Sequence, residues 1–392
     1  MKANLLVFGG GPLQLSIIET AIKLGYFTIV IDPDNNAPGK EIADIFYTVA
    51  GDDFDRTLEI AKQHNIKGIV TAATDKPILM MCRIAEQLNM PFPSYESCET
   101  VLDKAKFKKF LFENKLPHAK GISVVGDILP ETLDLQFPLI TKPVTNSGSR
   151  GVIKVENQNE LSTAVHETLQ HSKDSRFLIE EYIEGDEISV EVLVQKGIAH
   201  IIQITDKLVT PPPYNVEIGH IQPSKYSHLK ENIRVLLQTV VDKSGLDNCA
   251  LHPELKIKDD KITIIEIGPR LGGDFITSHL VPLSTGLNME EQNIRLATSL
   301  PIETNTIERA STVSFLNFPV NSVIKNTINI EQLQELFPEV VSFSCSLRKG
   351  EKVKRITNSL DRYGSYILKG FDYNELFKAR NNLNEFLNSL VN

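Results

Sequence analysis

Residues 250–270 read ALHPELKIKDDKITIIEIGPR, and this stretch decides the fold. Two apolar runs flank an Asp-rich turn, which is typical of a β-hairpin. Side chains alternate across a strand, so residues two apart share one face of the sheet. If the hairpin is centred on Asp260, Glu254 lies directly opposite Glu266 on the same face.

Two carboxylates that face each other across neighbouring strands destabilise a sheet. At ~4–5 Å and an effective dielectric constant of ~20, their repulsion is roughly 3–4 kcal/mol. A hard divalent cation, which prefers oxygen ligands, would neutralise the pair. The stretch therefore indicates a Mg²⁺–nucleotide site, and a pair of solvated surface glutamates is the alternative.

Composition narrows the class of protein. The chain has 392 residues, of which 41% are hydrophobic and 23% charged, so we expect two or three globular domains. A net charge of −9 argues against a sequence-independent nucleic-acid binder, which needs a basic face. The sequence contains no apolar run of about 18 residues, so we expect no membrane span. The first residues show no signal-peptide pattern.

The cysteines indicate a reducing compartment. Cys82, Cys98, Cys249 and Cys345 show no CxxC or similar spacing, which disfavours a disulfide framework or a zinc site. Together with the missing signal peptide and membrane span, this predicts a cytoplasmic protein.

Strands and helices alternate through residues 1–95, which predicts a parallel, doubly wound sheet. The first turn, GGGPLQ at 9–14, matches the first two glycines of a dinucleotide-binding fingerprint, and Asp32 follows at a suitable distance. The third glycine position is Gln14, however, and this glycine normally lets helix and strand pack closely. A plain glycine turn is therefore favoured over NAD binding.

Beyond residue 95 the pattern changes. A lysine-rich segment at 97–111 predicts one helix, and strands at 138–143 and 152–155 flank a loop of small residues. This loop lacks the Gly-Lys-Ser/Thr of a P-loop, so it would act as a flap whose backbone N–H groups close over phosphate. Lys142, just before it, offers a point charge suited to phosphate, although such a loop is often only a turn.

The sequence contains no internal repeat. Five features of the sequence occur in an order that is informative about the family. They are Asp103-Lys104, Lys142 with its flap, residues 180–183 with Glu187, the pair Glu254 and Glu266, and Pro269-Arg270. In this order the sequence resembles the ATP-grasp superfamily of carboxylate–amine (or carboxylate–thiol) ligases, over roughly residues 1–300.

The resemblance implies an architecture of α/β and α+β units. A Rossmann-like domain at 1–95 would precede an ATP-grasp fold, whose two α+β subdomains clamp ATP. The small and central subdomain would span 96–190 with the flap at 144–151. The large subdomain would span 191–392 and carry the metal site and the C-terminal segment.

The resemblance also implies roles in binding ATP. Lys104 and Lys142 would contact the phosphates beneath the flap, and Glu187 would bind the ribose hydroxyls. The flap residues concerned are Ser147, Gly148 and Ser149. The hinge that reads adenine would consist of Glu180, Glu181, Tyr182 and Ile183, with Glu180 accepting a hydrogen bond from the exocyclic amine.

At the reacting end, the resemblance makes Glu254 and Glu266 the ligands of Mg²⁺ (or Mn²⁺). Arg270 would steady the acyl phosphate or a substrate carboxylate, and Lys142 would assist it in catalysis. Many members carry Asn two residues after the second glutamate, where this chain has Gly268. His252 could replace that ligand or contact substrate, and a hydrogen-bonded core histidine is the alternative.

The run RLGGD at 270–274 is closer to the branch of L-amino acid ligases and carbamoyl-phosphate-synthase-like proteins, and it places Gly272 and Gly273 beside the substrate. We therefore expect an ADP-forming ligase that joins a carboxylate and an amine. Amino acids are the favoured substrates, and a homodimer is the expected assembly. The alternatives are a ligase for a nucleotide- or sugar-linked substrate, a nucleotide-binding protein without catalysis, and an NAD-linked oxidoreductase.

Overall fold

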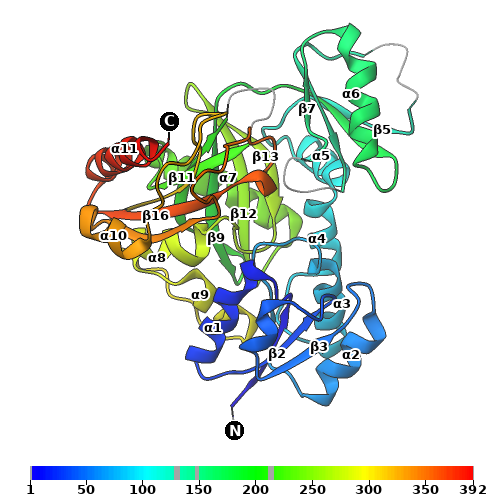
Figure 1. Ribbon diagram of the computed structural model, residues 1–392. Coiled ribbons are helices and arrows are strands. Elements are labelled where there is room, and N and C mark those ends of the chain that lie inside the picture. Colours follow the sequence, from blue (N-terminus) through cyan, green and yellow to red (C-terminus); the bar gives the residue numbers. More distant parts are fainter. Residues whose placement is uncertain (1, 128–132, 146–149, 211–215, 392) are drawn as a thin grey trace.

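The computed structural model describes residues 2–127, 133–145, 150–210 and 216–391. Its first unit, blue in Figure 1, is a parallel sheet in the order β3-β2-β1-β4. The strands are β1 Asn4–Phe8, β2 Phe27–Asp32, β3 Ile45–Thr48 and β4 Gly68–Val70. The helices are α1 Leu15–Lys23 on one face and α2 Phe54–Gln63 and α3 Ile78–Leu88 on the other. The predicted parallel, doubly wound sheet is confirmed.

The segment after this unit corrects one prediction. Instead of a single helix over 97–111, the chain forms α4 (Tyr95–Leu102) and α5 (Lys104–Glu113). Asp103 between them has extended backbone angles, and its carboxylate accepts from the backbone N–H groups of two residues of α5. Aspartate is a preferred N-cap, so Asp103 ends one helix and starts the next.

A small lobe follows, seen at the upper right of Figure 1. Its antiparallel sheet has the order β5-β8-β6-β7. The strands are β5 Gly121–Val125, β6 Leu139–Pro143, β7 Ile153–Val155 and β8 Arg176–Glu181, and helix α6 is Gln158–Gln170. Helix and sheet share a separate core around Leu139, Leu161 and Phe177.

The largest unit is an eight-stranded antiparallel sheet in the order β13-β12-β9-β10-β11-β14-β16-β15. Its strands are β9 Asp186–Gln195, β10 Ile198–Val209, β11 Glu217–Gln222, β12 Cys249–Lys258, β13 Lys261–Gly268, β14 Ala310–Phe315, β15 Val340–Cys345 and β16 Gly364–Gly370. Its helices are α7 Lys230–Ser244, α8 Val281–Thr285, α9 Met289–Ala297, α10 Ile330–Leu336 and α11 Tyr373–Ser389. Short helical segments are η1 Pro12–Gln14, η2 Pro38–Glu41, η3 Ser227–Leu229, the π-helix η4 Ile276–Leu280 and η5 Ser359–Asp361.

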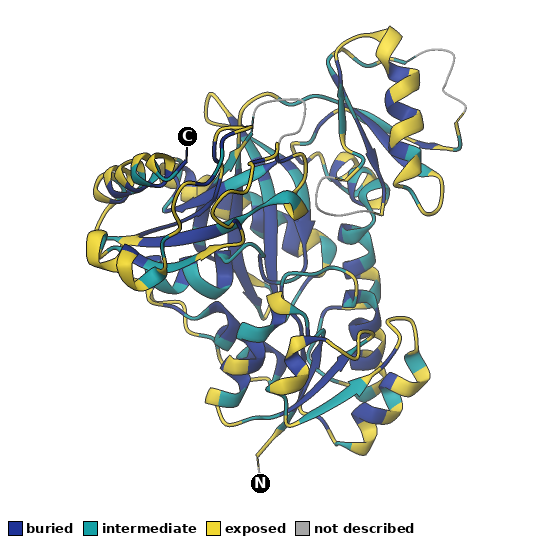
Figure 2. Ribbon diagram, viewed as in Figure 1, coloured by how far each residue is buried: buried dark blue, intermediate teal, exposed yellow. Residues whose placement is uncertain are grey.

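Two apolar cores join the first unit to the large sheet. Figure 2 shows buried residues in the first unit and in the large sheet. In one core Leu6 packs in the same cluster as Val192, and in the other Leu5 joins Leu193 and Leu271. The small lobe keeps its own core. Helices α4 and α5 pack in the first of these two cores through Cys98, Val101 and Phe107, and the division at residues 95 and 190 stays a prediction. Among the residues that the structure describes, no helix is both long and apolar enough to cross a membrane.

Candidate active site

The predicted hairpin is formed by β12 and β13, and Glu254 pairs with Glu266 as expected. The turn is tighter than predicted, because Asp259 and Asp260 both have positive φ and Lys258 pairs with Lys261. With that turn alone, Glu254 would face residue 265. A bulge between Glu254 and Leu255 shifts the register by one residue and brings the two carboxylates together.

Lysines surround this carboxylate pair. Lys207 Nζ lies 2.9 Å from Glu254 Oε2, and Lys104 Nζ lies 3.4 Å from Glu266 Oε2. Burial raises the pKa of Glu254 to about 7, and the neighbouring Glu266 adds to this rise. Burial also opposes charge on Glu266, but Lys104 and Lys142 lower its pKa to about 2. Glu254 keeps a raised pKa although Lys207 lies beside it, so the pair has room for a further positive charge, which fits a site for a hard divalent cation.

Lys207 is the central cation of the site. Besides Glu254, its ammonium contacts Glu187 at 2.5 Å and Glu217 at 3.0 Å. Burial opposes the charge of Lys207, but the three carboxylates raise its pKa well above the usual value. The lysine therefore stays charged. From its position on β10 it links β9, β11 and β12 at the floor of the site.

A second buried ion group lies where the small lobe meets α5. Glu180 accepts from Lys108 and from Lys142, each at 2.6 Å, and all three side chains are largely buried. Burial raises the pKa of Glu180, but the two lysines outweigh it and lower the pKa below its usual value. The Glu180 carboxylate is thus occupied by two lysines, and the contact with adenine that the sequence predicts for Glu180 stays a prediction.

The rest of the proposed hinge follows β8. The backbone N–H of Tyr182 donates to Pro138 at 2.9 Å, so this group is already used within the lobe. The Tyr182 ring lies between two ammonium groups, with Lys154 at 4.4 Å and Lys256 at 4.7 Å from its centroid. Such cation–π contacts fix the ring at the mouth of the site.

The predicted nucleotide residues converge on one cavity of about 290 Å³. Those that line it are Lys104, Lys142, Glu180, Glu181, Tyr182, Ile183, Glu187, Glu254 and Glu266. The flap residues Ser147, Gly148 and Ser149, and the proline-rich wall expected at 211–215, lie outside the described residues. A cleft with basic groups at one end and facing carboxylates on its floor is suited to a metal–nucleoside triphosphate.

Comparison with known proteins agrees with this geometry. Residues 135–278 match the model of the ATP-grasp domain family. These residues form an ATP-grasp domain.

Curated relatives are distant in sequence. The chain is 24% identical to the formate-dependent phosphoribosylglycinamide formyltransferase of Prochlorococcus marinus, over 79% of this chain and 80% of that relative. It is 21% identical to the arginine-specific carbamoyl phosphate synthase large chain of Bacillus subtilis, over 69% of this chain but 28% of that relative. Among solved structures, the L-amino acid ligase of Bacillus licheniformis has a TM-score of 0.81 at 21% identity, over 100% and 98% of the two chains.

Arg270 lies beyond the facing pair Glu254 and Glu266, just after the end of β13. Its guanidinium donates to Asp75 of the first unit at 2.8 Å. Gly268 lies beside this ion pair, because a Cβ there would be 3.2 Å from the Arg270 guanidinium carbon and 3.3 Å from Asp75 Oδ1. The space that an asparagine side chain would take is therefore next to a partly buried ion pair that links two units.

His252 shares the face of Glu254, but it bonds elsewhere. Its Nδ1 lies 2.8 Å from Glu191 Oε1, whereas its Nε2 lies 3.9 Å from Glu254. Burial lowers the pKa of His252, but Glu191 outweighs it and raises the pKa above its usual value. His252 is thus a buried, hydrogen-bonded histidine, which was the alternative considered from the sequence. Its contact with substrate remains a proposal.

Gly272 is required by this His252–Glu191 pair. A Cβ at residue 272 would lie 2.7 Å from His252 Nδ1 and 2.9 Å from Glu191 Oε2. A Cβ at Gly273 would meet only Ala73, at an ordinary 3.5 Å. Neither glycine lines the nucleotide cavity, and both line a second, smaller pocket against the first unit.

We expect Gly272→Ala to lower the free energy of unfolding by about 1–3 kcal/mol, because the buried pair has no room to shift. Gly273→Ala is the matched control and should change stability by less than about 0.5 kcal/mol. Urea denaturation of both variants measures the difference. Equal stability of the two variants would contradict the tight contact at residue 272.

Sequence reasoning placed Asp274 in the run 270–274 near the substrate, but it missed other charged residues of the site, namely Lys108, Glu191, Lys207, Glu217, His220 and Arg362. Lys207 carried one usable signal, because a lysine inside the apolar strand IAHIIQITDKLV needs a buried partner. The others show no local pattern, and only the packing of distant strands brings them together.

Proposed function

We propose that the protein forms an amide bond between a carboxylate and an amine through an acyl phosphate, with amino acids as the substrate class. The observation that carries this proposal is the closeness of two pockets. Glu217 lines the nucleotide cavity, and one of its side-chain atoms lies within 4.8 Å of one of Asp274, which lines a second pocket. This second pocket of about 60 Å³ is also lined by Gly272, Gly273 and the buried Glu290.

The first step joins two anions. A substrate carboxylate oxygen attacks the γ-phosphorus of ATP, the bond from that phosphorus to the β–γ bridging oxygen breaks, and ADP leaves. Lys104, Lys142 and Arg270 offset the repulsion between the two anions. Mg²⁺ held by Glu254 and Glu266 supplies further charge neutralisation when bound.

The second step uses the amine. Its nitrogen attacks the acyl carbon, the carbon–oxygen bond to phosphate breaks, phosphate leaves and the nitrogen loses a proton. The acyl phosphate reacts readily with water, so water has to be excluded during both steps. We propose that the flap at 144–151 provides this cover.

A ligase for a phosphoribosyl-linked amine is the second candidate, because the formyltransferase relative covers most of the chain. The substrate pocket disfavours it. Among the described residues that line this pocket, none is a lysine or an arginine, whereas Asp274 and Glu290 are acidic. A phosphate monoester would bring two negative charges beside these carboxylates.

The test is ADP release in the presence of ATP and Mg²⁺, measured across amino acids singly and in pairs, with bicarbonate and formate as controls. We expect release that requires two amino acids, together with a dipeptide mass. Release with formate or bicarbonate and a phosphoribosyl amine would select the second candidate. A response to none of these, with ATP still raising the melting temperature, would overturn amino-acid ligation.

A further inference from the structure

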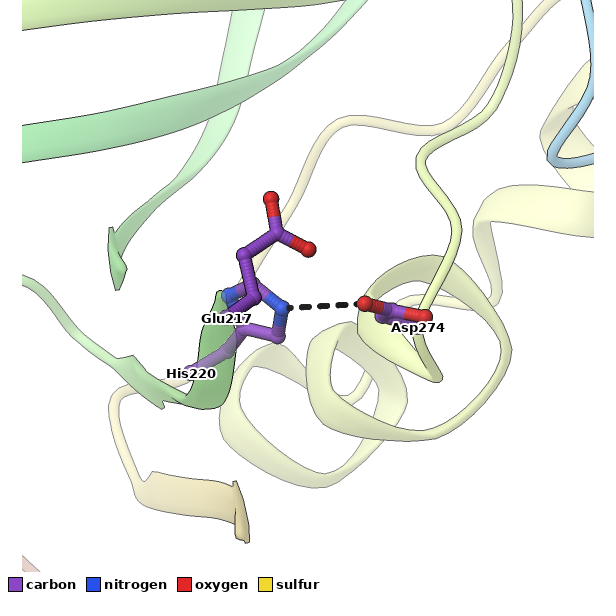
Figure 3. Close-up of side chains that lie close together, drawn as sticks. All are labelled: Glu217, His220 and Asp274. Atoms are coloured by element: carbon purple, nitrogen blue, oxygen red, sulfur yellow. Dashed lines mark ion pairs between the residues drawn. The ribbon is translucent and has the colours of Figure 1, made fainter. Parts of the chain in front are cut away.

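Three side chains that could bind a cation or a hydrogen-bond donor converge near the carboxylate pair Glu254 and Glu266. Glu217 and His220 lie on β11, and Asp274 lies in the loop before the π-helix Ile276–Leu280. One side-chain oxygen or nitrogen of each residue lies within 4.8 Å of the other two. Figure 3 shows the His220 ring directed at Asp274, with Glu217 alongside.

His220 lacks the partners that a buried imidazole needs. Its side chain is 1% exposed, and neither ring nitrogen makes a hydrogen bond with any described residue. The approach of Nε2 to Asp274 Oδ2, at 3.7 Å, is too long for a hydrogen bond. An unpartnered polar group in the interior is costly, so a ligand that bonds to His220 would be held strongly.

The position of the cluster connects it to both pockets. Glu217 lines the nucleotide cavity, close to Lys207 and Glu254. Asp274 lines the substrate pocket. A group held between Glu217 and Asp274 therefore lies at the junction where the phosphate end of ATP meets the substrate.

We propose that Glu217, His220 and Asp274 form the receptor for the ammonium group of the amine substrate; this inference rests on the proposed function. A primary ammonium has three N–H donors, and the cluster offers three acceptors from different side chains. Asp274 stays ionised beside Arg362, whose guanidinium opposes burial and helps to hold the pKa of this carboxyl below its usual value. The receptor would hold the nitrogen at the junction. The ammonium first gives one proton to a carboxylate of the cluster, and the free lone pair then attacks the acyl carbon.

A divalent metal ion fits the same three atoms less well. Arg362 Nη1 already donates to Asp274 at 2.9 Å, and Lys207 Nζ lies 3.0 Å from Glu217. An ion of charge +2 would be repelled by both cations about twice as strongly as an ammonium. Arg362 is itself held by the Phe315 ring, with 3.7 Å between its guanidinium carbon and the ring centroid, so it cannot easily withdraw.

Direct binding tests the receptor without relying on turnover. Glycinamide, which carries an ammonium but no carboxylate, is titrated into the full-length protein with an unreactive ATP analogue and Mg²⁺ present. We expect measurable heat of binding in the parent protein and at least about tenfold weaker binding in Asp274→Asn and in His220→Asn. Asp52→Asn, at an exposed position of the first unit, is the matched control and should bind like the parent.

A second measurement separates the two halves of the reaction. Hydroxylamine is uncharged at neutral pH and traps the acyl phosphate as a hydroxamate, so it does not need the receptor. We expect Asp274→Asn to raise KM for the amine at least about tenfold while hydroxamate formation stays within about twofold of the parent rate. Equal losses in both assays would assign Asp274 to the first step and overturn the proposal.

The remaining outcomes are also decisive. Zn²⁺ that binds the parent protein but not His220→Asn, without any binding of glycinamide, would make the cluster a metal site and overturn the receptor. Unchanged glycinamide binding in both variants would overturn it as well. If no carboxylate releases ADP or gives a hydroxamate, the proposed function fails, whereas the titration still decides whether the cluster binds an ammonium. If one variant does not fold, the other carries the test.

Discussion

Glu266→Gln will lower ATP-dependent ADP release by at least about 1,000-fold. The amide carries no charge and turns an N–H donor toward the space where a hard cation needs an anionic oxygen. The change also removes the negative charge that lies 3.4 Å from Lys104 Nζ and a main charge opposite Lys142. Steady-state ADP release at saturating Mg²⁺ measures the effect.

The fold should survive this substitution. Glu266 is only partly buried, and the hairpin is held by backbone pairing that the amide does not disturb. We expect the melting temperature to stay within a few degrees of the parent value, corresponding to less than about 1 kcal/mol. Glu335→Gln, on the exposed side of α10, is the matched control and should retain parent activity. ADP release within about tenfold of the parent in Glu266→Gln would refute the metal-ligand role.

Local chemistry explains why the hairpin could be predicted. Its turn and its alternation lie within one short stretch, so period-2 patterning was enough to place Glu254 opposite Glu266. The bulge at Ile265 could not be foreseen, because an extra residue in one strand leaves no mark in apolar alternation. The pairing was right because an assumed looser turn and the actual bulge shift the register by the same single residue.

The helical region shows the converse. Apolar residues keep a helical spacing through 97–111, which suggests one helix, but Asp103 caps a new one. The capping signal was present in the sequence, since aspartate before a lysine-rich run is a good N-cap. The prediction followed the apolar spacing and overlooked this cap. In the structure, the cap at Asp103 separates the two helices.

The charged floor of the site lay beyond sequence reasoning. Lys207 and His220 are paired neighbours on β10 and β11, whereas Asp274 and Arg362 come from distant loops. Their convergence depends on the order of strands in the large sheet, which no local pattern encodes. Most residues that line the large cavity were predictable from ordered motifs, and the cations and acceptors that set their charge were not.

Lys207→Met will lower the free energy of unfolding at neutral pH by about 3–5 kcal/mol. The ammonium is 4% exposed and contacts Glu187, Glu217 and Glu254 within 3.0 Å. Methionine fills a similar volume, so the loss comes from three carboxylates that keep no common counter-charge. Urea denaturation at neutral pH measures it, and Lys225→Met, which breaks one half-exposed ion pair with Asp186, should cost less than about 1 kcal/mol.

The pH dependence identifies the cause. In the parent protein burial already raises the pKa of Glu254 to about 7 although Lys207 opposes the rise, so removing Lys207 raises it further. A carboxyl group whose pKa is higher in the folded than in the unfolded state takes up a proton on folding, and acid then favours the folded state. The deficit of Lys207→Met should therefore be largest above pH 7 and shrink as the pH falls toward the usual pKa of glutamate. A deficit that is independent of pH would point to lost packing instead, and the three glutamates would then not depend on this lysine for their charge.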